Sequence, residues 1–194
     1  VNVVGSSIAR ESDDVLYTWA GPEIAVATTK AYSTQMVVLN LLGLYFGDIM
    51  GTIDLETYTA MVQGIQALPH QMEEILSDTG YIQAAARELA GHDQVFFIGR
   101  NLDYALSLEG SLKLKEISYI HSEAYASGEL KHGTISLIEP GTLVVALGTY
   151  EPLFDKAMSN VVEVKARGAE VLALATEPFK EKMAHTADSV IAVP

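Results

Sequence analysis

Four short apolar runs alternate with amphipathic segments through the second half of the chain. Each run has the length of a buried strand and is bounded by turn residues: residues 95–98, 143–147, 171–175 and 190–193. Helical patterns follow the first three runs: one after Asn101, one over residues 152–167 and a short one after Pro178. Continuous apolar strands that alternate with helices are typical of a parallel sheet covered on both faces. We therefore predict an α/β fold with three layers.

The first half of the chain is mainly helical, with strand-like pieces near its start. Residues 15–19 predict a short strand, and residues 1–4 are also strand-like. Thr28 or Thr29 is the expected N-cap of a long helix that runs through Gly43. Because the first residue is a valine and both ends of the chain are strand-like, we interpret the sequence as a piece of a longer protein.

Two further helices are expected before the alternating region. Residues 54–77 carry apolar side chains at helical spacing, and Pro69 marks a kink or a break. Residues 81–90 predict a shorter helix. The turn Gly99-Arg100-Asn101 then leads from a strand into a helix, where an arginine can help to hold an anion. A plain strand-to-helix turn is the simpler interpretation of these three residues.

Composition and charge exclude several classes of function. With 194 residues and 49% apolar content, the chain can form one or two ordinary domains with a core. A net charge of −13 argues against nucleic acid or an anionic membrane as partner, because phosphates require basic surface. The most apolar window, residues 36–46, contains Asn40 and is shorter than the ~20 residues that span a bilayer. The absence of cysteine suits a reducing compartment, and we expect a cytoplasmic protein.

Three charged residues share one side of the helix that follows Asn101. At roughly 100° per residue, Glu109, Lys113 and Glu116 fall within about 60° of one another. Apolar residues flank this charged stripe: Leu106, Leu108, Leu112 and Ile117. Serines occupy the opposite face: Ser107, Ser111 and Ser118. The charges therefore lie in the middle of the apolar arc, where a helix normally contacts a core.

The stripe has two interpretations. In the simpler one it is a solvated ladder, in which Glu109 and Lys113 form an i,i+4 pair worth about 0.2–0.5 kcal/mol. Solvated ladders normally face away from leucines, however, and this one is expected to face the core. Partly buried charges at close range shift each other's pKa values, as a proton-transfer site requires. We therefore predict a catalytic face.

The residues around the stripe resemble a known family. Residues 113–121 read Lys-Leu-Lys-Glu-Ile-Ser-Tyr-Ile-His, residues 128–133 read Gly-Glu-Leu-Lys-His-Gly, and residues 21–30 read Gly-Pro-Glu-Ile-Ala-Val-Ala-Thr-Thr-Lys. These motifs resemble the sugar isomerase (SIS) domains of the glucosamine-6-phosphate synthase family, and the resemblance extends along nearly the whole chain. It implies a tandem pair of flavodoxin-like parallel sheets, the first copy incomplete here.

The resemblance also implies a domain map. Residues 1–52 would be the C-terminal part of a first SIS domain, residues 53–91 linking helices, and residues 92–194 a second SIS domain without its C-terminal tail. The family's hydroxyl-rich phosphate loop and its Schiff-base lysine would both lie outside this sequence. We therefore expect the fragment alone to be inactive.

Site residues follow from the resemblance position by position. Glu116 matches the base that moves a proton between C1 and C2 of the sugar, and Lys113 would assist it. His132 matches the ring-opening histidine, which can act across a dimer interface, although a loop histidine bound to backbone carbonyls is the alternative. Thr28 matches a sugar-contacting position, which an N-cap role explains equally well. Glu109 either orients Lys113 or is purely structural.

Neighbouring polar residues are expected to have no part in the chemistry. We predict that Glu129 and Lys131 are solvated loop charges and that His121 is a packed histidine. The remaining histidines, His70, His92 and His185, show no metal-ligand spacing. We expect neither a metal nor a cofactor.

The resemblance implies fructose 6-phosphate and glucosamine 6-phosphate as ligands, a glutaminase domain in the same full-length chain, and a homodimer. The fragment itself cannot be the glutaminase, which uses a cysteine nucleophile in this family. Two other hypotheses stay open. One is a related SIS deglycase or isomerase of ketosamine phosphates, and the other is a non-catalytic SIS sensor of sugar phosphates.

Overall fold

The computed structural model describes residues 1–194, apart from the side chains of residues 88 and 89. The chain divides into two compact units, residues 1–73 and 74–194. Each unit is described by itself below. The domain boundaries expected from the sequence, after residues 52 and 91, stay a prediction.

Unit 1 contains α1 (Ser7–Glu11), α2 (Lys30–Ile49) and most of α3 (Leu55–Ser77). The strands predicted over residues 1–4 and 15–19 are wrong, because both segments lack regular structure. Two backbone hydrogen bonds join them, from Thr18 N to Val1 O and from Val1 N to Leu16 O, together with a side-chain bond from Thr18 Oγ1 to Asn2 Oδ1. Trp19 has a φ of 54°, which ends the extended conformation before a ladder can form.

Both predicted long helices are present, and α2 extends further than predicted. The N-cap of α2 is Thr29, whose side chain makes no capping hydrogen bond, and the helix continues past Gly43 to Ile49. Gly51 then turns the chain with a φ of 64°, while Thr52 N donates to Gly47 O. In α3 the helix is continuous through Pro69, so the alternative of a break is wrong, whereas the alternative of a kink stays a prediction.

Unit 2 is built on a five-stranded sheet with the order β2-β1-β3-β4-β5, in which every pairing is parallel. Its strands are β1 (Gln94–Gly99), β2 (His121–Ala126), β3 (Leu143–Gly148), β4 (Glu170–Thr176) and β5 (Ser189–Val193). Its α-helices are α4 (Gly80–Leu89), α5 (Leu102–Ser118), α6 (Phe154–Lys165) and α7 (Lys180–Ala184). Short 3₁₀ segments are η1 (Ser127–His132), η2 (Thr134–Leu137), η3 (Glu151–Leu153) and η4 (Glu177–Phe179). The predicted α/β fold with a parallel sheet is confirmed.

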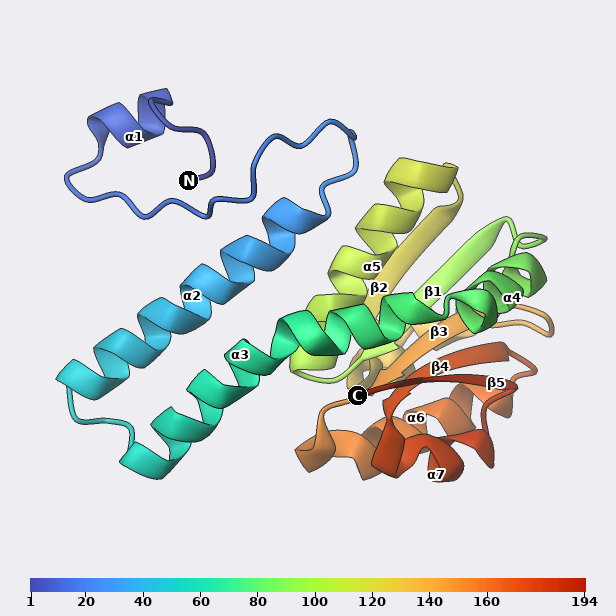
Figure 1. The fold of residues 1–194 in the computed structure, drawn as a ribbon. Coiled ribbons are helices and arrows are strands. Elements are labelled where there is room, and N and C mark those ends of the chain that lie inside the picture. The colour runs from blue at the N-terminus through green and yellow to red at the C-terminus, as the bar shows by residue number, and fades with distance from the viewer. The chain divides into compact units, whose positions relative to one another are not determined.

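Helices cover both faces of this sheet (Figure 1). On one face, Phe96 and Val144 pack against Phe154 and Val161 of α6 and Met183 of α7. Val95, Leu143 and Val145 point to the other face, where Leu114 of α5 packs on them. The alternation between the two clusters follows from the period of two along each strand. All four strands predicted within unit 2 are confirmed, whereas β2 was missed.

The missed strand, β2, lies at the edge of the sheet. Its sequence, His-Ser-Glu-Ala-Tyr-Ala, has no apolar run because only its Ser122 is buried. Pairing with β1 alone gives this segment its structure, with Val95 opposite Ser122. A polar edge strand of this kind has no hydrophobic signal in the sequence. Separately, none of the helices in the described part of the chain is long and apolar enough to cross a membrane.

Candidate functional site

The three charged residues of the stripe meet on α5. Lys113 Nζ donates to Glu116 Oε2 at 2.5 Å and lies 3.5 Å from Glu109 Oε1. The spacings of three and four residues place both carboxylates one helical turn from the lysine, on the same side of the helix. The lysine side chain is 20% exposed. The structure therefore brings together Glu109, Lys113 and Glu116, as the sequence predicted.

The face of α5 that packs on the sheet is not the predicted one. The buried residues of this helix are Asp103, Ser107 and Ser111. The leucines that flank the stripe are exposed, together with Ile117: Leu106, Leu108 and Leu112. The predicted orientation, with the apolar arc against the core, is wrong. The charged stripe is half-buried but faces away from the sheet.

Small residues explain this orientation, because they let α5 approach the strands closely. A Cβ on Gly110 would lie 3.0 Å from the ring of Phe97, and one on Gly99 would collide with the backbone of Asp103. Ser122 of β2 donates to the carbonyl of Ser111, and their hydroxyls lie 3.0 Å apart. A leucine in place of Ser111 would be too large for this gap, although Leu114 fits one turn further along the helix.

The positive charge of Lys113 lies between two carboxylates. The hydrogen bond to Glu116 raises the pKa of Lys113 above its ordinary value; desolvation lowers it, and the charges of both glutamates raise it further. Lys113 therefore stays protonated and takes one oxygen of Glu116, Oε2. A carboxylate held in this way has a fixed direction and a second oxygen with which it can accept a proton.

His132 is the last residue of η1, which follows β2. Its imidazole is 76% exposed, and its Nε2 lies 3.9 Å from Glu129 Oε2. Glu129 is exposed, as predicted, but Lys131 is not simply a solvated charge, since it pairs with Glu163 at 2.7 Å. His121, predicted to be packed, is instead exposed at the start of β2.

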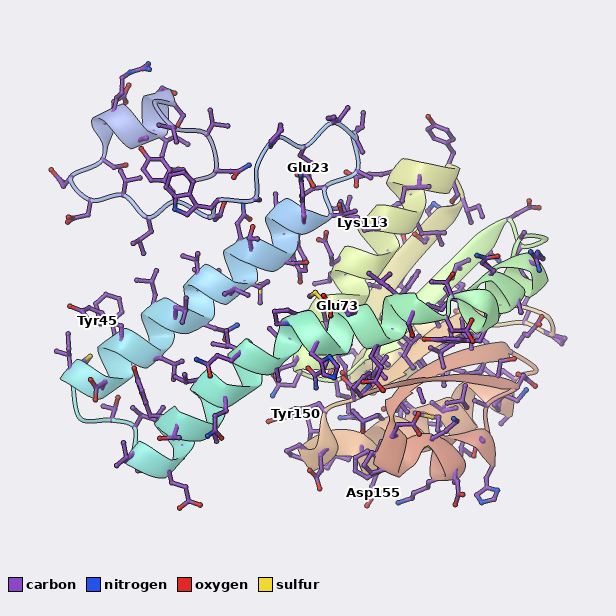
Figure 2. All side chains as sticks on the ribbon, in the orientation of Figure 1. Glu23, Tyr45, Glu73, Lys113, Tyr150 and Asp155 are labelled. Carbon is purple, nitrogen blue, oxygen red and sulfur yellow. The ribbon has the colours of Figure 1, made fainter. Side chains whose placement is uncertain are left out.

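Within unit 2, His132 and Glu116 belong to opposite ends of the sheet. α5 returns the chain from the carboxyl end of β1 to the amino end of β2, so Glu116 lies near the amino ends of the strands. η1 begins where β2 ends, at the carboxyl edge. The six residues of β2 span roughly 20 Å. Figure 2 shows Lys113 toward the C-terminal end of α5, whereas Tyr150, which follows β3, lies at the carboxyl ends of the strands.

Thr28 belongs to unit 1, one residue before the N-cap of α2. The N-cap itself is Thr29, whose backbone N–H donates to Glu23 at 2.7 Å. The N-cap explanation for Thr28 is therefore wrong, and the half-buried Thr28 has no capping role.

Asp103 was not singled out from the sequence, although it is almost fully buried in the first turn of α5. It accepts hydrogen bonds from Thr149 N, Thr149 Oγ1 and Tyr150 N, at distances of 3.1, 2.5 and 3.1 Å. These bonds join α5 to the end of β3 across the switch in strand order, where open parallel sheets commonly bind ligands. The only signal in the sequence was an aspartate in the first turn of a helix.

The sequence profile described as the SIS domain matches residues 88–194. The chain belongs to the SIS domain family. This SIS domain coincides with the parallel sheet and helices of unit 2, apart from the start of that unit.

Two curated relatives match nearly the whole chain. Both are named glutamine–fructose-6-phosphate aminotransferase (isomerizing). The chain is 60% identical to the protein of Symbiobacterium thermophilum over 184 residues, which are 95% of this chain and 30% of that protein. It is 54% identical to the protein of Clostridium acetobutylicum over 193 residues, which are 100% of this chain and 32% of that protein. The chain thus spans about a third of the length of these relatives.

A solved structure shows the same fold over nearly the full chain. The C-terminal domain of glucosamine-fructose-6-phosphate aminotransferase from Francisella tularensis superposes with a TM-score of 0.94 at 36% sequence identity. The superposition covers 99% of this chain and 54% of the other.

Proposed function

We propose that this chain is part of the isomerase portion of a glutamine–fructose-6-phosphate aminotransferase. In the complete protein it would convert fructose 6-phosphate and ammonia into glucosamine 6-phosphate, with the ammonia supplied by a glutaminase domain of the same chain. The identity of 60% to a protein of that name, along 95% of this chain, carries the proposal. The Glu109–Lys113–Glu116 stripe supports it, because the reaction needs a directed carboxylate.

The conversion is a sequence of proton transfers around C1 and C2 of the sugar. Ammonia first replaces the C2 carbonyl oxygen as an imine and releases water. Removal of the C1 proton by Glu116 leaves its electron pair as a C1–C2 double bond, while the imine nitrogen gains a proton. The proton is then returned at C2, and the C1 hydroxyl loses its proton to become the aldehyde. Lys113, hydrogen-bonded to Glu116 Oε2, leaves Oε1 as the proton-accepting oxygen.

His132 would open the furanose ring before these steps, since an imidazole can both donate and accept a proton near neutral pH. In one copy of unit 2 it stands at the other end of the sheet from Glu116. A second copy of the chain can bring a His132 to the stripe, and this separation supports a homodimer with a shared site. Thr28 would be a sugar contact, and Glu109 would orient Lys113.

The proposed organisation follows the family resemblance. Residues 1–52 would belong to a first SIS domain, residues 53–91 to linking helices, and residues 92–194 to a second SIS domain. The protein would act in hexosamine biosynthesis in the cytoplasm. It would require neither a cofactor nor a metal, since every step above is a proton transfer or an addition to a carbonyl.

Deuterium exchange at C1 of the sugar phosphate tests the proposal in the complete protein. Glu116→Gln keeps the shape of the side chain but removes the base, so exchange followed by NMR in deuterated water should fall about 10²–10⁴-fold. The matched control is Glu177→Gln, because Glu177 also pairs with a lysine one turn away, Lys180, but outside the stripe. Exchange that survives Glu116→Gln would assign the base elsewhere.

A further inference from the structure

A chain of polar contacts joins the turn after β1 to α6 and η1. Arg100, after β1, donates from Nε to Asn160 Oδ1 at 2.9 Å. Asn160, on α6, donates from Nδ2 to Glu163 Oε2 at 3.0 Å. The other oxygen of Glu163 contacts Lys131 Nζ at 2.7 Å. We call Arg100, Asn160, Glu163 and Lys131 the α6 network.

Asn160 is the fixed point of the α6 network. It is 1% exposed, so an unpaired amide there would cost the desolvation of its polar atoms. Its orientation has a single consistent assignment, because a guanidinium can only donate and a carboxylate can only accept. The amide oxygen must face Arg100 and the amide nitrogen must face Glu163. Flipping the amide of Asn160 would break both hydrogen bonds.

The α6 network holds η1 at two points. The Arg100 guanidinium lies against Gly128, where an added Cβ would be 3.0 Å from Nη2 and 3.1 Å from Nη1. Lys131 is tied to Glu163 of α6 at the other end of the segment. Between them, Leu130 is fully buried in the main core. These contacts fix the backbone of η1 up to Lys131. His132 follows Lys131, and its imidazole remains exposed.

We propose that Asn160 and Glu163 are positioning residues, which hold η1 so that His132 meets the ring oxygen of the sugar. This inference rests on the proposed function. Proton transfer requires heavy-atom distances of about 2.6–3.2 Å, and a misplacement of about 1 Å can cost up to 10²-fold in rate. Among the described side chains, the polar partner of the imidazole is Glu129 at 3.9 Å, so the reach of His132 depends on where η1 places its backbone.

The electrostatics of Glu163 agree with this role. Burial raises the pKa of Glu163, but hydrogen bonds from Lys131 and Asn160 lower it by more, and the nearby charges of Lys131 and Arg100 act in the same direction. The carboxylate therefore stays ionised and keeps its hold on Lys131.

Two substrates separate positioning of His132 from a general loss of structure. Fructose 6-phosphate closes into a furanose ring, whereas 5-deoxyfructose 6-phosphate lacks the hydroxyl that closes it and stays open. In the complete protein, Glu163→Gln keeps a partner for the Asn160 amide but removes the ion pair with Lys131. We expect its kcat/KM with fructose 6-phosphate to fall about 10-fold, with no change on the open-chain analogue. Lys131→Met should give the same pattern, and the double variant should lose no more than either single one.

The matched control lies on the same helix. Lys165 of α6 pairs with Asp188 at 2.7 Å, close to the amino end of β4, so Lys165→Met removes a similar ion pair away from η1. It should leave the ratio of the two substrates unchanged. Equal losses on both substrates, or no loss, in Glu163→Gln would overturn the positioning role. The proposed function is tested separately by Glu116→Gln, which must stop C1 exchange on the open-chain analogue as well.

Discussion

The charged stripe of α5 and the α6 network are both ionic, but they are built in different ways. In the stripe, Lys113 meets carboxylates three and four residues away on its own helix. In the α6 network, Arg100 and Asn160 are 60 residues apart and come from different elements. The stripe needs only a helix to form, whereas the network needs the whole sheet to be assembled. The stripe can therefore be recognised from the sequence alone, whereas the α6 network cannot.

The stripe was visible in the sequence, yet its surroundings were misjudged, because the helix turns its serines to the sheet. The α6 network had no signal in the sequence, yet its geometry is the more constrained of the two, since Asn160 is buried with both ends of its amide paired. Short spacing reveals which residues meet. It does not reveal which face of a helix is covered.

The largest expected difference between the two regions lies in whether a variant loses turnover on the ring-closing substrate alone or on the open-chain analogue as well. His132→Asn removes the titratable group of η1, so turnover of fructose 6-phosphate should fall about 10²-fold, while 5-deoxyfructose 6-phosphate should be almost unaffected. Glu116→Gln, in the stripe, should depress both substrates alike. Steady-state kinetics on the complete protein checks this contrast. A similar loss on both substrates in His132→Asn would reject ring opening as the role of this histidine.

A second comparison concerns the two faces of α5. Ser111→Leu places a large side chain between α5 and β2 and should lower the free energy of unfolding by about 1–3 kcal/mol. Leu112→Ser, one residue on, changes a side chain that is 43% exposed and should cost less than about 1 kcal/mol.

Urea unfolding of the two α5 variants shows which of them loses more free energy of unfolding. The hydrophobicity of the sequence alone predicts the reverse order. A larger loss in Leu112→Ser would therefore restore the predicted orientation of the helix.

The smallest expected effect is in the pH dependence of stability, where the two clusters should respond at opposite ends of the scale. The folded pKa of Glu163 lies below 4.5, so its ionised form stabilises the fold above that pH, and this contribution is lost as the pH falls through the folded pKa. The folded pKa of Lys113 lies above 10.5, so its contribution is present below that pH and is lost as the pH rises.

Unfolding of Glu163→Gln and Lys113→Gln at several pH values checks these directions. The destabilisation in Glu163→Gln, under about 1 kcal/mol near neutrality because Lys131 is mostly exposed, should shrink in acid. The difference between wild type and Lys113→Gln should shrink in alkali. Any variant whose deficit grows where it should shrink would contradict the assigned partner.

The predictable part of the fold consists of elements with a strong local signal. Strands such as β3, which is apolar along its whole length and buried throughout, are recognisable from their residues alone. The short helix after Pro178 and the long helices were also found. The prediction failed for three segments: residues 1–4, residues 15–19 and strand β2. Whether each of these segments forms a strand depends on whether a neighbouring strand is present to pair with it. Pairing is a property of the fold, and local composition does not encode it.

By itself the sequence determined the α/β class, the apolar strands and the meeting of Glu109, Lys113 and Glu116, because each depends on residues within a few positions of one another. Only the tertiary structure decided that the serine face of α5 is covered and that Glu116 and His132 stand at opposite ends of the sheet. It also decided that Asn160 and Glu163 hold the segment before His132. These facts depend on which surfaces can approach closely: Gly99, Gly110 and Ser111 allow α5 near the strands. Steric fit between distant residues, rather than hydrophobicity along the chain, set the final arrangement.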